Sequence, residues 1–166
     1  MKSKKVAKET IYFDRDTYSK KLSFLAKGIM RIYDIDESGQ EWNKVFLSPP
    51  SLVLGNPNFE EKSTHYVETI SDCEVIELPI DLVKTHLKNY PETRELQSKL
   101  LLHLFEKKSK REYDFLTLNA KERYLKYLKE HSHIINEIPQ FHIASYLGIT
   151  STQLSRINVS IKNQQM

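Results

Sequence analysis

The sequence contains a single cysteine, Cys73, and only four glycines among its 166 residues. One cysteine excludes an intramolecular disulfide and any zinc site built from several cysteines. So few glycines, with only six prolines, also exclude a low-complexity chain. Cys73 lies in the strand-like segment Cys-Glu-Val-Ile-Glu-Leu, where we expect it to be a small buried apolar residue.

Long apolar runs are also missing. No stretch approaches the roughly 20 apolar residues of a membrane span, and no apolar core of a secretory signal follows the basic segment Met1–Val6. We therefore expect a cytoplasmic protein without a membrane partner. The net charge is only +3, which permits a nucleic-acid partner without requiring one. Residues 119–166 hold six Lys or Arg against three Glu, so this segment carries the whole excess.

Motifs of common enzyme classes are absent. There is no Gly-x-Ser-x-Gly, no phosphate-binding glycine loop and no His-Glu-x-x-His. A metal-dependent cupin needs histidines and a carboxylate on neighbouring strands, yet His65 is the only histidine before His86. His131 and His133 have the spacing of a ligand pair, but they follow a helix end and lack a further partner. We predict no catalytic residue, no metal and no cofactor.

The first 78 residues are expected to form short β-strands. Asp36–Gly39 has the composition of a hairpin turn, residues 51–59 are expected to be irregular, and another turn is expected at residues 71–72. Short strands joined by turns favour a sandwich or barrel over a parallel sheet. The predicted strands cover residues 22–26, 29–35, 41–47, 64–70 and 73–78.

Helical periodicity begins at Pro79. Residues 80–89 predict a short helix, and residues 91–115 predict a long one with Pro91 in its first turn. An apolar stripe on the long helix is typical of a dimer seam, although it could instead pack on the chain's own β-domain. The predicted interface residues are Leu96, Leu100 and Leu104.

Residues 139–157 have the pattern of a helix-turn-helix, preceded by a supporting helix that starts at the capping box of Asn119 and Glu122. Gly148 ends the first helix, where a left-handed backbone allows a sharp turn. Thr150-x-x-Gln153 is a second capping box. Small and apolar residues occupy the inward positions of both helices: Ile143, Ala144, Leu147, Ile149, Leu154 and Ile157.

The second helix of such a motif lies in the major groove of DNA. Arg156 can pair with a guanine edge or hold a phosphate, whereas Gln153 can read adenine or serve only as a cap. Thr150 is more suited to capping than to base contact. The candidate DNA-binding residues are Thr150, Ser151, Thr152, Gln153, Ser155 and Arg156.

The order of β-domain, long helix and helix-turn-helix resembles the Crp/Fnr family of bacterial transcription regulators. Residues 24–41, 73–78 and 143–157 carry the likeness. It implies an α+β fold with a cupin-like, cyclic-nucleotide-binding-like β-roll, a dimerisation helix and a winged-helix DNA-binding domain. It also implies a homodimer on a pseudo-palindromic operator, with RNA polymerase as a further candidate partner.

Departures from the family limit what the resemblance implies. Gly55 is not followed by the glutamate of cyclic-nucleotide-binding members, and no arginine occurs between Arg31 and Arg94. Cyclic AMP is therefore not expected as effector, and one cysteine cannot hold an iron–sulfur cluster. Ser151-Thr-Gln replaces the common Arg-Glu-Thr of the recognition helix, so only Arg156 matches. We also expect the wing to be short or absent and the β-roll to be abridged at its N-terminus.

These observations predict a β-roll over residues 1–78, linker and dimerisation helices over 79–117 and a helix-turn-helix domain over 118–166. The predicted function is sequence-specific DNA binding in transcription regulation, with an unidentified effector. The alternative is a protein-interaction or small-molecule-sensing module whose helix-turn-helix does not read DNA.

Overall fold

The computed structural model describes residues 2–163 and has an α+β fold. Eight strands form two antiparallel four-stranded sheets, ordered β1-β8-β3-β6 and β2-β7-β4-β5. The strands are β1 (Lys2–Val6), β2 (Ile11–Phe13), β3 (Lys21–Lys27), β4 (Met30–Ile35), β5 (Glu41–Leu47), β6 (Ser51–Val53), β7 (Tyr66–Thr69) and β8 (Cys73–Pro79).

The hairpin of β4 and β5 confirms the predicted turn at Asp36–Gly39, where Gly39 has a positive φ of 84°. The prediction that residues 51–59 are wholly irregular was wrong, because Ser51–Val53 pairs with β3. Strands β7 and β8 follow one another around the turn at residues 71–72 but belong to different sheets, so this turn carries the chain across the roll. Strands β1 and β2 had no recognisable alternation and were not predicted.

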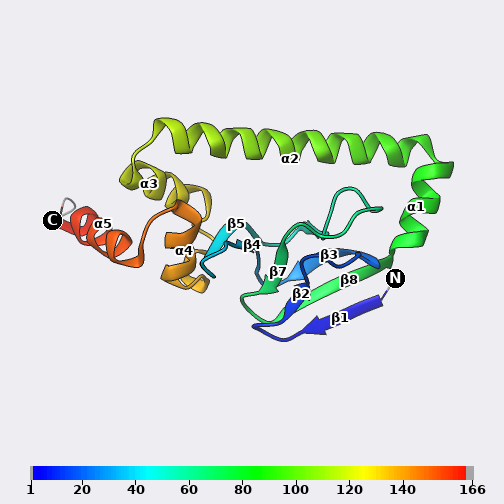
Figure 1. The fold of residues 1–166 in the computed structure, drawn as a ribbon, viewed down its shortest axis with the longest axis horizontal. Helices are drawn as coiled ribbons and strands as arrows, with labels where there is room; N and C mark the ends of the chain where they lie inside the picture. The colour runs from blue at the N-terminus through cyan, green and yellow to red at the C-terminus, as the bar shows by residue number, and fades with distance from the viewer. Residues whose placement is uncertain (1, 164–166) are drawn as a thin grey trace.

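Five α-helices follow the strands (Figure 1). The long helix α2 runs along one side of the molecule, while α3, α4 and α5 gather at the end opposite to α1. The helices are α1 (Ile80–Asn89), α2 (Pro91–Thr117), α3 (Ala120–Glu130), α4 (Gln140–Leu147) and α5 (Ser151–Asn163), with a 3₁₀ turn at Ile135–Glu137. Because α5 ends at the last described residue, the expectation about the wing lies outside the described residues.

Two apolar cores hold the fold together. One fills the β-roll and includes Cys73, which is buried as expected. The other joins the helices to the roll: α4 packs on β5, and Ile29, Phe46 and Ile70 share a cluster with the buried residues of α3, α4 and α5. The second cluster fixes the helix-turn-helix segment against the β-roll.

Candidate nucleic-acid interface

Helix α4 ends at Gly148 for a steric reason. Gly148 has φ 68° and ψ 34°, a left-handed conformation that disfavours side chains with a Cβ. Its backbone amide donates to the carbonyl oxygens of Ala144 and Ser145. The backbone amide of Ile149 donates to the carbonyl oxygen of Ala144 at 3.0 Å. A Cβ at Gly148 would lie 2.9 Å from Cε1 of Phe115. The turn therefore needs glycine both for its backbone and for its contact with α2.

The predicted capping box at the start of α5 is present. The amide of Gln153 donates to Oγ1 of Thr150 at 3.1 Å, and the amide of Thr150 donates to Oε1 of Gln153 at 2.9 Å. Gln153 thus serves as a cap here, the simpler of its two predicted roles. Leu154 is 1% exposed and anchors α5 on the helices beneath it.

All six candidate DNA-binding residues are exposed, on the turn and the first half of α5: Thr150, Ser151, Thr152, Gln153, Ser155 and Arg156. No described residue forms a hydrogen bond or ion pair with the guanidinium of Arg156. Lys162 adds positive charge to the last turn of α5. The surface of α5 is therefore polar, basic and available to an anionic polymer.

A buried polar network underneath α4 was not predicted. Arg31 on β4 is only 4% exposed and forms ion pairs with Glu68 at 2.5 Å and Glu41 at 2.6 Å. Its guanidinium also stacks over the ring of Tyr33, 3.8 Å from the centroid. Carboxylates on both sides of a buried guanidinium offset the cost of removing it from water.

This network connects β4 and β5 to α4. Asn43 is 2% exposed, and its side-chain amide donates to the backbone oxygen of His142 at 3.1 Å. The backbone amide of Asn43 donates to Oγ of Ser145 at 2.9 Å, and Ser145 in turn donates to the backbone oxygen of Glu41 at 2.8 Å. We call Arg31, Asn43, His142 and Ser145 the docking network.

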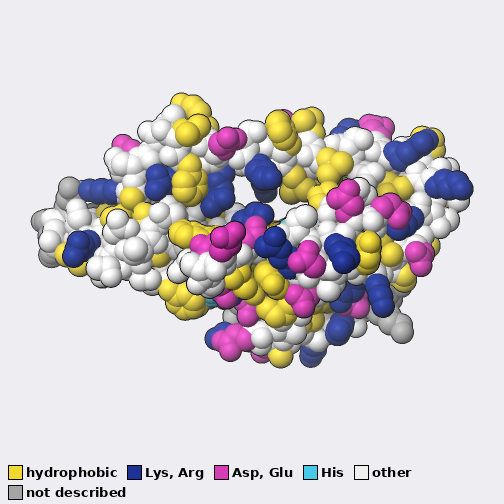
Figure 2. Space-filling model, in the orientation of Figure 1, with side chains coloured by type: hydrophobic (Ala, Val, Ile, Leu, Met, Phe, Trp, Pro, Cys, Tyr) yellow, Lys and Arg dark blue, Asp and Glu magenta, His cyan; other side chains and the backbone are white. Residues whose placement is uncertain are grey.

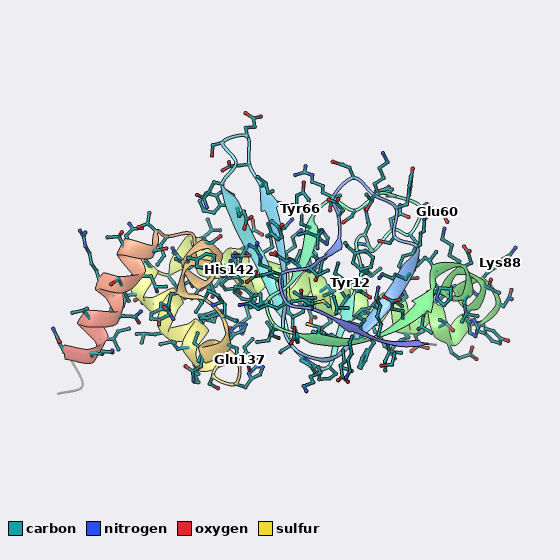
Figure 3. The ribbon with its side chains drawn as sticks, turned by 90° about the horizontal axis from the view of Figure 1, so that it is seen from below. Tyr12, Glu60, Tyr66, Lys88, Glu137 and His142 are labelled. Carbon is teal, nitrogen blue, oxygen red and sulfur yellow. The ribbon has the colours of Figure 1, made fainter. Side chains whose placement is uncertain are left out.

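His142 is the titratable residue of the docking network, and Figure 3 shows it on α4 beside the strands. Its Nδ1 lies 3.2 Å from the side-chain nitrogen of Asn43 and 3.3 Å from Nη1 of Arg31. Both neighbours are donors, so Nδ1 must accept and the proton of a neutral imidazole is on Nε2. Burial, followed by repulsion from Arg31, lowers the pKa of His142 to about 4. The imidazole is therefore neutral at physiological pH.

A groove of about 650 Å³ separates the β4–β5 hairpin from the turn between α4 and α5. Trp42 and Phe141 are its large aromatic residues, 42% and 58% exposed, and Glu41 supplies an acidic group. The cap residues Thr150 and Gln153 form part of the opposite wall. The hairpin thus lies close to the end of α5 that carries the candidate DNA contacts.

The long helix α2 has 27 residues and none of them is buried. The predicted interface residues are half-buried or exposed: Leu96 is 68% exposed, Leu104 is 41% exposed and Leu100 is intermediate. The alternative that this stripe packs on the chain's own β-domain does not describe the structure. Figure 2 shows apolar side chains along the outer edge of the molecule that α2 forms.

The two histidines with the spacing of a ligand pair, His131 and His133, contact different neighbours. Nε2 of His133 lies 3.1 Å from Oγ of Ser48, and the ring of His131 stacks on Tyr127 at 4.4 Å. The part of the chain from residue 2 to 163 holds no group of three His, Cys, Asp or Glu side chains suited to a metal ion. Within the same residues, no helix combines the length and hydropathy of a bilayer span.

No protein-family model matches the sequence, and no curated protein is significantly similar to it. Solved structures do match. FixK2 from Bradyrhizobium japonicum aligns with a TM-score of 0.87 at 15% identity, over 99% of this chain and 85% of that one. A CRP/FNR-family transcriptional regulator from Thermus thermophilus aligns with a TM-score of 0.80 at 14% identity, over 98% and 87% of the two chains.

The chain has the Crp/Fnr fold. A CooA mutant from Carboxydothermus hydrogenoformans aligns over 98% of this chain and 77% of its own, with a TM-score of 0.75 at 14% identity. The Crp/Fnr fold therefore extends over the β-roll, α2 and the helix-turn-helix together. At these identities the likeness establishes the architecture, while function has to be argued from the residues.

Proposed function

We propose that this chain is a Crp/Fnr-type transcription regulator that binds a pseudo-palindromic DNA operator as a homodimer. The observation that carries the proposal is the helix-turn-helix itself, which has a buried inner face, a glycine turn, a capping box and a polar outer face. A second helix held in this way can enter the major groove, where its first residues meet base edges.

Arg156 is the principal base-reading candidate. It lies on the exposed face of α5, six residues after the cap residue Thr150, and has no partner among the described residues. A free guanidinium can pair with guanine O6 and N7, a contact worth roughly 1–3 kcal/mol of discrimination. Thr152 and Ser155 lie on the same exposed part of the helix and would add base or phosphate contacts.

Selection of bound sequences from a random duplex pool tests DNA binding directly. An enriched inverted repeat with half-sites about one helical turn apart is expected from a dimer. Arg156→Ala should abolish this enrichment while the circular dichroism spectrum stays unchanged. Lys88→Ala is a matched control, because Lys88 is an exposed cation on α1 at the far end of the molecule (Figure 3). Absence of enrichment even at low salt would favour the protein-interaction module.

The dimer is proposed to form through α2. An exposed leucine stripe on a helix without buried residues is unfavourable in water, and a second copy would cover it. Leu100→Asp together with Leu104→Asp should yield monomers in sedimentation. Leu116→Asp is the control, since Leu116 is 80% exposed near the end of α2 and is not part of the stripe. Wild-type monomers would refute this interface.

We further propose that the regulator does not respond to cyclic AMP. At the position where the family binds the cyclic phosphate, two side chains bond to nearby backbone oxygens. The hydroxyl of Ser63 donates to the backbone oxygen of Gly55 at 3.0 Å, and the side-chain amide of Asn56 donates to the backbone oxygen of Lys62 at 2.8 Å. The side chains of Asn56 and Ser63 are thus bonded within the segment, which offers no guanidinium. Cyclic AMP should leave both the melting temperature and DNA affinity unchanged; a rise in either would refute this part.

A further inference from the structure

Helix α5 forms one end of the molecule (Figure 1), and its apolar residues divide between two faces. Leu154 is buried, and Ile157 and Ile161 pack against the same core while partly buried. These three recur at the spacing of one helical face, so they define the inner side of the helix. Val159 is out of phase with them. It is 56% exposed, and among the described residues of α5 it is the one large apolar side chain exposed to solvent.

Val159 belongs instead to the face that carries the candidate DNA contacts. It follows Thr152 by seven residues, Ser155 by four and Arg156 by three, and side chains at these spacings lie on the same side of a helix. About two helical turns separate Thr152 from Val159, so the two side chains are nearly aligned along the axis. The proposed DNA-reading face therefore has an apolar group among its polar residues.

The fold does not account for a valine at this position. The side chain of Val159 belongs to neither apolar core. A β-branched residue is also a weaker helix former than alanine, lysine or glutamate, and an exposed isopropyl group is unfavourable in water. Contact with an apolar group of a ligand would remove this side chain from water.

Double-stranded DNA offers one apolar group at the base edges of its major groove, the C5-methyl group of thymine. A valine side chain has no donor or acceptor, so it cannot read the hydrogen-bonding pattern of a base pair. It can distinguish thymine from cytosine, which has no methyl group at C5. Three residues give a rise of about 4.5 Å along a helix, and successive bases are about 3.4 Å apart. In the major groove, Val159 and Arg156 therefore match bases one or two steps apart.

We propose that Val159 is a specificity-determining residue that packs against the C5-methyl group of a thymine, one or two base pairs from the base that Arg156 contacts. This inference rests on the proposed function, because it requires α5 to lie in the major groove. It deepens that function by assigning an A·T pair to a defined place in each half-site. Arg156 reads by hydrogen bonds, whereas Val159 selects by apolar contact alone.

Deoxyuridine substitution tests the contact, since deoxyuridine differs from thymidine only in lacking the methyl group. Each thymine in one half-site of the enriched operator is replaced in turn, and binding is measured by fluorescence anisotropy. At one position the wild-type protein should lose affinity about fourfold, the effect of one methyl group left in water. Val159→Ala should bind the unsubstituted operator about fourfold more weakly and should show no further loss at that position, because the two changes remove the same contact.

Ser160→Ala is the matched control, because Ser160 is exposed on α5 but lies to the side of the reading face. It should keep the wild-type profile. Alanine is the better helix former at both positions, so both variants should fold. Equal losses in the wild type and in Val159→Ala at every thymine would overturn the inference and leave DNA binding intact, as would deoxyuridine without effect anywhere. A random pool without any enriched sequence would overturn the proposed function and this inference together.

Discussion

Replacing Arg31 with methionine should destabilise the folded chain by about 3–5 kcal/mol, the usual cost of removing one partner from a buried ion pair. Methionine preserves most of the apolar stem above Tyr33, so the loss reports on charge rather than volume. Glu68, whose side chain is 17% exposed, would keep a buried negative charge without its cation. Asn43 would also lose a donor at 3.2 Å.

Urea unfolding followed by circular dichroism measures this loss. Arg15→Met is the matched control, because the side chain of Arg15 is 42% exposed and its ion pair with Asp16 is long, at 3.8 Å. Exposed pairs contribute roughly 0–1 kcal/mol, so the control should be nearly neutral. In the Arg31→Met variant, Glu68→Gln should lower the free energy of unfolding by less than it does in the wild type. The reason is that Glu68 has already lost its partner Arg31.

Two outcomes would refute this account of Arg31. A loss under about 1 kcal/mol, equal to that of the control, would show that the buried guanidinium is not stabilised by its carboxylates. Strict additivity of Arg31→Met and Glu68→Gln would show that the two residues do not interact energetically, whatever their distance.

Three further predictions concern the helical segment. Gly148→Ala should cost about 1–3 kcal/mol in urea, because φ is 68° and the new Cβ meets Phe115; Gly39→Ala, with open space around it, should cost less, and equal costs would argue against the contact. The pKa of His142 lies at about 4 instead of 6.5, so the unfolded chain takes up a proton first as the pH falls from 7 towards 4. The free energy of unfolding should fall by about 1–3 kcal/mol between pH 7 and pH 4, after allowance for the partial exposure of His142. In the His142→Asn variant this pH dependence should be weaker. Asn119→Ala should cost about 1 kcal/mol by removing the cap of α3, and an unchanged urea midpoint would contradict this.

The helix-turn-helix was predictable from sequence because its requirements are local. Gly148, the capping pair Thr150 and Gln153, and the buried Leu154 lie within seven consecutive residues, and each is needed for a steric or hydrogen-bonding reason that spacing alone reveals. The β4–β5 hairpin was predictable for the same reason, since its turn and its alternation are continuous in the chain.

The docking network was not predictable, because its partners are far apart in sequence. Asn43 and Ser145 are separated by 102 positions, and neither has a motif that marks it as a contact. The one available signal was an arginine between the apolar residues Met30 and Ile32 of a predicted strand, since a charge at a buried position needs a counter-charge. Strands β1 and β6 were missed because pairing with β8 and β3, not residue propensity, makes them strands.

The shared core of α4 and β5 has a consequence for synthesis. The ribosome makes Phe46 about one hundred residues before Ile143, yet both belong to one apolar cluster. Until α4 emerges, Ile29, Phe46 and Ile70 therefore remain without the helical part of their packing, and their apolar side chains stay exposed on the nascent β-roll. The apolar cluster around β5 is therefore completed only after the helix-turn-helix has been made.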